Sequence, residues 1–445
     1  MTIVFCGPPH SGKSVLIANL KRRLPDDCQR VLRACPDGEG DWSNENGNFN
    51  ADVRNKGAFT PEFIERFCSA IDNNQDSKIV IVDVGGRRTE ENREIFSHCD
   101  SYVVLCSTIP ENEGEMHEWQ QFADSIIRNG TEGEHLECFA LLDSELSGTE
   151  EIYTQNGDGG PLTGKATGLE RKTLLKTSPL LDKLAARIIK ESGYTLEDSR
   201  HLDLHNLSGL ALAHSVGCQK SEMIEDVEVP KAFWGYDSIS KVYDVLSELT
   251  SENQGKVQEV NIDAVRPAFI LCACTKALLD SGIETINTMD SENNAFVPIR
   301  RIEQKDGIRE TDGLEYHVIE GKKGIFLDLD IEGQNYTLEE YANCVLPKLN
   351  SNKPLFISGR VPNWLMASIA TSYDSPSVSV LQPPKGFVCT CSQDKKELGT
   401  LRESIPGINL DKYFEDKKEA MKSGKTFEFA NDEYLIDEKS QSDER

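Results

Sequence analysis

The chain begins MTIVFC-GPPHSGKS-VLIANL, residues 1–20, and this stretch decides the fold of the N-terminal part. The apolar run Ile3–Cys6 has the pattern of a buried strand, and Val15–Leu20 has the pattern of a helix. Between them lies the loop Gly7–Ser14, which contains two glycines and ends in Lys-Ser. Strand, glycine-containing loop and helix in this order are what a phosphate-binding loop requires.

The loop predicts a nucleoside triphosphate site, because glycine lets backbone N–H groups surround the phosphates at a helix N-terminus. Lys13 is expected to neutralise the β- and γ-phosphates, and Ser14 to bind Mg²⁺. The residues expected to contact the nucleotide are Gly7, His10, Ser11, Gly12, Lys13, Ser14 and Val15. His10 is interpreted as a spacer rather than a catalytic group. The alternative to the whole site is an ordinary glycine-rich turn.

A second apolar strand pattern, Lys78–Asp83, ends in a carboxylate and is followed by Val84-Gly85-Gly86. Ligands bind at the carboxyl ends of parallel strands, so Asp83 is the candidate for the second residue that organises Mg²⁺. The alternative is that Asp83 only caps the following turn. Two further apolar runs, Tyr102–Cys106 and Leu136–Leu142, are separated by a helical pattern. This alternation predicts an α/β fold with a mostly parallel sheet.

An acidic stretch lies between the predicted helix Val15–Leu20 and Asp83, with Asp37, Glu39 and Asp41 set among glycines and ahead of Trp42. Its carboxylates are candidates to coordinate metal, to act as a general base or to orient the nucleophile that attacks ATP. A solvated acidic turn is the competing interpretation.

Composition limits the range of functions. The net charge of −27 argues against a broad nucleic-acid-binding surface, although a small basic pocket for a short oligonucleotide remains compatible with it. The cysteines lack paired CxxC spacing, which predicts no structural zinc site and a reducing cytoplasm. No apolar run approaches the length of a membrane span, and no signal peptide is expected.

The middle of the chain carries clear loop and helix signals. Ser144–Gly168 is rich in glycine and polar residues and is expected to be a mobile loop. Ser178 and Pro179 predict a helix start, with apolar positions down to Ile189 and a stop at Gly193. A strand around His201–Leu207 is expected to complete a first domain, residues 1–210.

An internal repeat follows. Ile262, Pro267 and Phe269 align at one offset with Ile357, Pro362 and Trp364, and Tyr236 with Val245-Leu246 aligns at another offset with Tyr336 and Val345-Leu346. This similarity predicts two related α/β units, residues 211–308 and 309–410, that pair as a pseudo-twofold dimer within one chain. Residues 411–445 are dense in charge and are expected to be a solvated tail, helical at most in part.

The second copy contains Phe356-Ile357-Ser358-Gly359-Arg360-Val361-Pro362-Asn363-Trp364-Leu365. This stretch closely resembles the signature Ile-Ser-Gly-Arg-x-Pro-x-Trp-Leu of the CRISPR-associated ring-nuclease family Csx-three, and the likeness spans roughly residues 315–395. The resemblance implies ferredoxin-like α/β units that associate in pairs, bind cyclic tetra-adenylate and occur fused to P-loop ATPases. The residues expected to bind the cyclic oligoadenylate are Ser358, Gly359, Arg360 and Asn363, since a turn with one guanidinium can bind a phosphate. The alternative is that Arg360 only pins the turn.

The chain also departs from the family pattern. Thr371-Ser372 stands where the family has histidines, and Gln382-Pro383-Pro384 stands where it has Asp-Pro-Arg. Without an imidazole or carboxylate, metal-assisted cleavage of a phosphodiester at this site lacks both ligand and base.

Together these patterns predict a type III CRISPR accessory protein with an N-terminal P-loop NTPase. Binding of cyclic oligoadenylate is expected to control Mg²⁺-dependent ATP hydrolysis or phosphoryl transfer at Lys13, Ser14 and Asp83. One alternative is a ring nuclease, using a metal such as Mn²⁺, that degrades cyclic tetra-adenylate; another is a nucleotide-gated assembly scaffold. A homo-oligomer in the cytoplasm is expected, while the phosphoryl acceptor, the ring size and the oligomeric state stay open.

Overall fold

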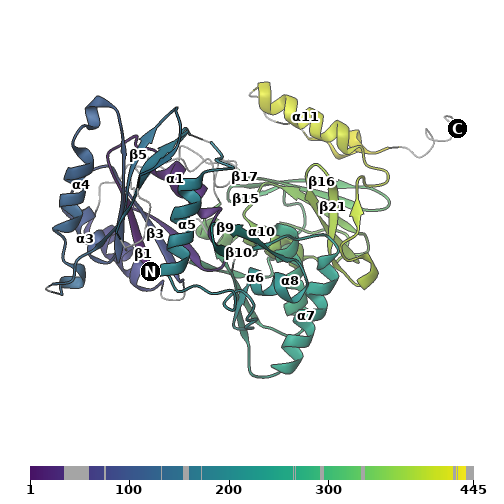
Figure 1. Ribbon diagram of the computed structural model, residues 1–445. Helices are drawn as coiled ribbons and strands as arrows, with labels where there is room; N and C mark the ends of the chain where they lie inside the picture. Colours follow the sequence, from purple (N-terminus) through teal and green to yellow (C-terminus); the bar gives the residue numbers. More distant parts are fainter. Residues whose placement is uncertain are drawn as a thin grey trace. The chain divides into compact units, whose positions relative to one another are not determined.

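The computed structural model describes residues 1–34, 60–74, 77–131, 133–153, 160–171, 173–263, 265, 267–290, 295–331, 336–423, 427 and 429–436 (Figure 1). The fold over these residues is mixed α/β with largely parallel sheets. The chain divides into two compact units, Met1–Ser199 with Lys220–Lys231, and Arg200–Gln219 with Ala232–Arg445. No helix in the described part of the chain combines the length and apolar character of a membrane span.

The first unit is built on one sheet. Its described strands are β1 (Thr2–Cys6), β2 (Gln29–Ala34), β3 (Ile79–Val84), β4 (Ser101–Ser107), β5 (Glu137–Glu145), β6 (Glu151–Ile152) and β7 (Leu162–Thr167). They lie in the order β2-β3-β1-β4-β5-β7-β6, and all pairs are parallel except β6 with β7. The strand that precedes the glycine-containing loop therefore lies between β3 and β4, with their carboxyl ends at one edge.

Helices cover both faces of this sheet (Figure 1). They are α1 (Lys13–Lys21), α2 (Pro61–Asp72), α3 (Glu90–Ser97), α4 (Glu115–Asp124) and α5 (Pro179–Glu191). Successive residues of a strand point to opposite faces. Ile3 and Phe5 accordingly pack with α1 and α5, and Val4 and Cys6 pack with α2, α3 and α4. The alternating α/β pattern predicted from the sequence is therefore confirmed.

The helix signal at Ser178 is confirmed, whereas the loop expected over Ser144–Gly168 is wrong in part. The Ser178 hydroxyl accepts a hydrogen bond from Leu181 N at 3.2 Å, as an N-cap does. Within the expected loop, β7 pairs with β5, and its buried side alternates through Leu162, Gly164 and Ala166. This alternation of buried and less buried residues is typical of a strand, although two of its buried residues are small.

The second unit contains two larger sheets and a short parallel pair. The first sheet has β8 (Asn206–Ser208), β11 (Glu259–Asp263), β12 (Thr285–Asp290) and β13 (Ala295–Ile299). The second has β15 (Glu310–Thr311), β16 (Leu314–Glu320), β17 (Ile325–Ile331), β19 (Leu355–Gly359), β20 (Ser377–Gln382), β21 (Gly386–Ser392) and β22 (Leu401–Arg402). The pair is β14 (Gln304–Lys305) with β18 (Leu346–Pro347). The hairpin of β9 (Gln219–Ile224) and β10 (Val227–Ala232) belongs to the first unit except for its two end residues. The strand expected at the end of the first domain is β8, which pairs with β11 in the second unit.

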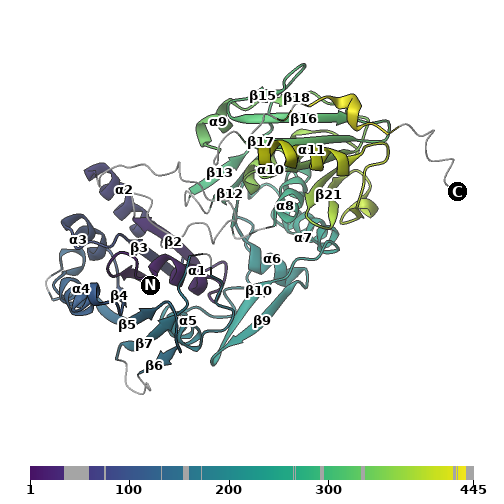
Figure 2. The ribbon, with the colours of Figure 1, turned by 90° about the horizontal axis from the view of Figure 1, so that it is seen from above.

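The helices of this unit are α6 (Gly209–Ser215), α7 (Ser238–Glu252), α8 (Ala268–Asp280), α9 (Leu338–Asn343), α10 (Asn363–Ser372) and α11 (Leu410–Ser423) (Figure 2). Helices α8 and α10 pack against each other. Each also contacts a strand of the other sheet, because α8 touches β21 and α10 touches β12 and β13. The cysteines at 272, 274, 389 and 391 are buried in α8 and β21, which contact each other.

The two repeated segments have the same topology. The strand order β13-β12-β11-β8 in one sheet corresponds to β21-β20-β19-β17 in the other, with matching antiparallel and parallel pairs. Pro267 and Pro362 both cap the helix between the two parallel strands. The upstream match joins unlike elements, because Leu246 lies in α7 whereas its counterpart Leu346 lies in β18.

The ferredoxin-like topology implied by the family resemblance is not found in these segments. A ferredoxin-like unit splits its βαβ connection by placing another strand between the two parallel ones. Here β11 pairs directly with β12, and β19 pairs directly with β20.

The segment expected to be a solvated tail packs against the second sheet over much of its described length. Tyr413 of α11 and Tyr434 are buried with Phe326 and Phe356 on one face of the sheet. The aromatic residues in this charged segment, rather than its net charge, decide its position.

Candidate functional site

The loop Gly7–Ser14 joins β1 to the start of α1 and needs glycine at two positions. Gly7 has φ 138° and Gly12 has φ 86°, both in the region that disfavours side chains. A Cβ on Gly7 would lie 2.0 Å from the carbonyl oxygen of Leu105 in β4, so the loop has no room for one. Gly12 is the N-cap of α1, which leaves the first helical N–H groups free of a side-chain cap. The loop thus combines a tight turn with an uncapped helix N-terminus.

Lys13 is buried inside this loop. Its ammonium donates to the carbonyl oxygens of Gly7 and Pro8, both at 2.9 Å, and lies 3.5 Å from Ser11 Oγ. A buried lysine charge requires such partners. The arrangement holds a cation beside the first residues of the loop.

Ser14 and Asp83 meet at the carboxyl edge of the sheet. The Ser14 hydroxyl donates to Asp83 Oδ2 at 3.0 Å, and Arg33 Nη1 forms an ion pair with the same oxygen at 3.2 Å. Asp83 is buried near the end of β3, and Arg33, near the end of β2, is partly buried. Its contacts with Ser14 and Arg33 place Asp83 beside the start of α1.

The remaining loop residues predicted to contact a nucleotide lie in the same place. Ser11 is buried, His10 is exposed with φ 61°, and Val15 packs in the core under α1. Hydroxyl and carboxylate oxygens are the ligands that Mg²⁺ prefers, so Ser14 and Asp83 together fit that ion. Asp37, Glu39 and Asp41 lie outside the described residues.

Sequence reasoning missed three residues around this loop. Arg33 of β2 forms an ion pair with Asp83. Ser144 of β5 donates its hydroxyl to Ser11 O at 2.8 Å and fixes the loop from the neighbouring strand. Burial and the nearby Glu145 raise the pKa of Asp143, its neighbour. Asp143 and Ser144 directly follow the predicted strand Leu136–Leu142, and this position is the signal that could have identified them, whereas no strand was predicted before Arg33.

The residues suggested by the family resemblance lie together in the second unit. Ser358 and Gly359 end β19, and Arg360 and Asn363 flank Pro362 at the start of α10. Ser358 is buried, whereas Arg360 and Asn363 are exposed. The group therefore combines a strand end, a helix N-terminus and one guanidinium, but its serine is not on the surface.

Thr371 and Ser372, at the positions of the family's histidines, have structural roles. Both are buried and donate to carbonyl groups one turn earlier in α10, Thr371 to Ala367 and Ser372 to Ser368. Ser372 also accepts a hydrogen bond from Ile302 N at 2.9 Å. Their hydroxyl groups are therefore engaged in hydrogen bonds with the backbone.

A buried polar cluster lies between the second sheet and α11. His317, Asp328 and Asp330 offer ligand atoms within 4.8 Å of one another, a spacing suited to a metal ion. The ammonium of Lys417 already lies between the carboxylates, 2.5 Å from Asp328 and 2.6 Å from Asp330. Tyr413 donates to Asp328 at 2.7 Å and also contacts His317. The cluster is an internal ion-pair network that attaches α11 to the sheet.

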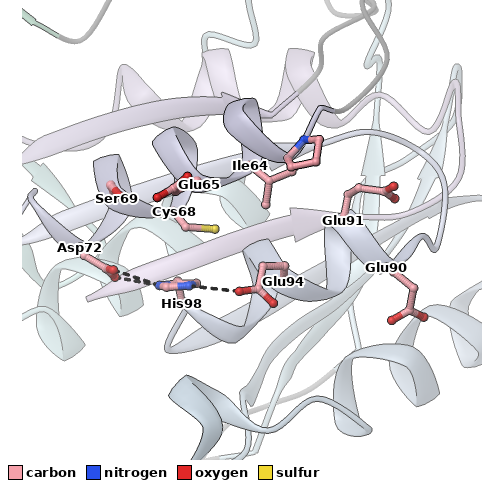
Figure 3. A pocket seen from close by; sticks show the side chains of 10 residues that line it. Ile64, Glu65, Cys68, Ser69, Asp72, Glu90, Glu91, Glu94 and His98 are labelled. Atoms are coloured by element: carbon pink, nitrogen blue, oxygen red, sulfur yellow. Dashed lines mark hydrogen bonds and ion pairs between the residues drawn. The ribbon is translucent and has the colours of Figure 1, made fainter.

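A groove of about 600 Å³ lies along α2 and α3 in the first unit (Figure 3). Ile64 and Cys68 lie in it, and its acidic side chains include Glu65, Asp72, Glu90, Glu91 and Glu94. His98 lies between Asp72 and Glu94 and pairs with both. No residue of the loop Gly7–Ser14 lines the groove, and its carboxylates would repel a polyphosphate. It is therefore not a second candidate for the nucleotide site.

No protein-family model matches the chain, and no curated protein of similar sequence is found.

Proposed function

We propose that the chain binds ATP with Mg²⁺ at the loop Gly7–Ser14, in a domain of the P-loop NTPase type. The observation that carries this proposal is the contact of the Ser14 hydroxyl with the Asp83 carboxylate beside an uncapped helix N-terminus, with the Lys13 ammonium held on the carbonyl groups of the same loop. Phosphate groups are stabilised by such N–H groups and by the lysine charge. Strand β1, which leads into the loop, pairs directly with β3, which carries Asp83, and this pairing supports the same assignment.

The chemistry proposed for the site is ATP hydrolysis or phosphoryl transfer. Bound Mg²⁺ would neutralise charge on the phosphate oxygens. Lys13 would stabilise the charge that develops on the transferring group, and Ser14 and Asp83 would hold the ion. Arg33 would orient the Asp83 carboxylate through their ion pair.

We further propose that a cyclic oligoadenylate, with cyclic tetra-adenylate as the first candidate, binds the second unit and controls this activity. This part depends on the likeness of residues 356–365 to the ring-nuclease signature. The exposed Arg360 at the start of α10 supports phosphate binding there. The buried, backbone-bonded Thr371 and Ser372 argue against cleavage of the ring at this position.

The test is phosphate release from ATP and Mg²⁺, with and without cyclic tetra-adenylate, while the cyclic ligand is followed in the same tube. Stimulated release with an intact ring is expected. Lys13→Ala should lose ATP binding by at least about 100-fold and abolish release, since it removes the charge facing the phosphates. A consumed ring with unchanged ATP turnover would instead identify a ring nuclease, and ATP binding unaffected by Lys13→Ala would refute the proposed nucleotide site.

A further inference from the structure

Arg87 lies in the segment between β3 and α3, four residues after Asp83. The preceding residue, Gly86, packs directly on the glycine-containing loop, because a Cβ there would lie 2.5 Å from the backbone nitrogen of Pro9. Consecutive Cα atoms are about 3.8 Å apart, so the Arg87 side chain starts beside the same loop. Gly7 and Pro8, the residues just before Pro9, hold the Lys13 ammonium. Arg87 therefore begins near the end of the site where the terminal phosphate is expected.

The backbone around Arg87 is fixed on its C-terminal side. The buried side chain of Asn92 donates to the carbonyl oxygen of Arg87 at 2.6 Å, and Thr89 caps the start of α3. The next residue, Arg88, is held by Glu115 and Glu118 of α4, each at 2.5 Å. The position from which the Arg87 side chain leaves the backbone is thus well defined.

The Arg87 side chain, unlike that of Arg88, is not held by an acidic partner among the described residues. It is exposed, and its guanidinium forms no hydrogen bond or ion pair with any residue that the structure describes. Two adjacent arginines therefore differ: Arg88 ties the segment to α4, and Arg87 presents a positive charge to the solvent beside the loop.

We propose that Arg87 is a catalytic residue that binds the γ-phosphate oxygens in the transition state of ATP cleavage. This inference depends on the ATP chemistry proposed above. In hydrolysis, the oxygen of water bonds to the γ-phosphorus while the bond to the bridging oxygen breaks. That bond's electrons leave with ADP, and the proton from water passes to the released phosphate. A guanidinium binds two phosphate oxygens at once and stabilises the charge that develops on them.

The test compares the wild-type protein with Arg87→Ala, Arg87→Lys and the control Arg66→Ala, which removes an exposed arginine on α2. ATP turnover is measured with Mg²⁺ and cyclic tetra-adenylate. Binding of ADP alone and of ADP with aluminium fluoride, which imitates the transferring phosphoryl group, is measured by calorimetry.

For Arg87→Ala we expect kcat to fall by about 100-fold or more, as for other arginines that act on a transferring phosphoryl group. The affinity for ADP alone should change less than about threefold, while the gain from aluminium fluoride should be lost. Arg87→Lys should recover only part of the gain, and Arg66→Ala should match the wild type. Wild-type kcat and wild-type aluminium fluoride affinity in Arg87→Ala would overturn this role. If Lys13→Ala also binds ADP as tightly as the wild type does, the nucleotide site itself is refuted.

Discussion

Asp83 is the residue on which the proposed metal chemistry depends most directly. It is buried, and one of its oxygens contacts both the Ser14 hydroxyl and the Arg33 guanidinium. A neutral amide has the same size but binds Mg²⁺ weakly, because it lacks the negative charge. The contribution of Asp83 can therefore be separated from that of packing by a change that alters only charge.

Asp83→Asn is predicted to raise the Mg²⁺ concentration needed for half-maximal ATP turnover by at least about tenfold. The measurement is phosphate release over a Mg²⁺ titration, with Asp72→Asn, an exposed acid of the same unit, as the control. If Asp83→Asn needs the same Mg²⁺ concentration as the wild type, Asp83 does not bind the metal ion.

Lys417 gives a prediction about stability. Its ammonium is the cation between Asp328 and Asp330, and Asp328 is only 1% exposed. Lys417→Met leaves these carboxylates without their cation, so the free energy of unfolding should fall by about 3–5 kcal/mol. The exposed neighbour Lys418 offers a matched control, and Lys418→Met should change the value by less than about 0.5 kcal/mol.

Urea unfolding of both variants measures the difference. Adding Asp328→Asn to Lys417→Met should restore part of the loss, because the unpaired buried charge is then removed. Equal effects of the two lysine changes would show that the ion pair does not hold α11.

Single residues were predictable from sequence where their chemistry is local. Lys13, Ser14 and Asp83 were identified by their place behind apolar strands, and Ser14 and Asp83 are in contact. Arg33 and Lys417 were not assigned roles, because each acts on a carboxylate far away in the sequence. Long-range ion pairs leave no periodic pattern in one sequence.

At the scale of elements, α11 combines two groups that respond to alkaline pH. Burial favours the neutral form of Lys417, but the charges of Asp328 and Asp330 outweigh it and raise the pKa of the lysine. Burial and the charge of Asp328 also raise the pKa of Tyr413. A group whose pKa is raised in the folded state contributes stability that is fully present below its unfolded-state pKa and is lost as the pH rises above that value. The unfolded-state pKa is about 10.4 for lysine and about 10 for tyrosine, so both groups lose their contribution at alkaline pH.

The attachment of α11 should therefore be constant from neutral pH to about pH 9 and weaken above about pH 10. Hydrogen exchange of the α11 amides, corrected for the intrinsic pH dependence, measures this directly. The amides of α5 serve as an internal reference. Uniform loss of protection in both helices above pH 10 would indicate global unfolding instead.

Elements differed in how well the sequence predicted them. Helix α5 has a serine cap, a proline at its first position and a wide apolar face, and all three signals agree. Strand β7 was missed because its buried positions include Gly164 and Ala166, which carry little apolar signal. The charges of α11 concealed two aromatic residues, Tyr413 and Phe414, that pack on the sheet side. The average composition of a segment conceals single aromatic residues, whereas the packing of the segment depends on each of them.

At the scale of the whole molecule, the sequence predicted the repeat but not its topology. The matched positions Ile262 with Ile357 and Pro267 with Pro362 lie in equivalent strands and helix starts. Which strands become neighbours is set by the packing of α8 and α10 between two sheets, and this is a property of distant contacts. For the same reason the sequence did not show that β8, a strand of three residues, pairs with β11.

Control of ATP turnover by a cyclic ligand makes a thermodynamic prediction that involves the whole chain. If cyclic tetra-adenylate raises the affinity for ATP by some factor, ATP must raise the affinity for cyclic tetra-adenylate by the same factor. Coupling of this kind is typically about 5–150-fold. Calorimetric titration of each ligand, with and without saturating amounts of the other, measures both factors when a non-hydrolysable ATP analogue is used.

Two variants separate the sites in this measurement. Lys13→Ala should retain binding of the cyclic ligand, and Arg360→Ala should retain binding of the ATP analogue, because the two residues belong to different compact units. Each should abolish the coupling, since one of the two ligands no longer binds. Equal affinities with and without the second ligand would mean that the units act independently. The cyclic ligand would then have to act, if it acts at all, on the rate of the chemical step, for which no reciprocity is required.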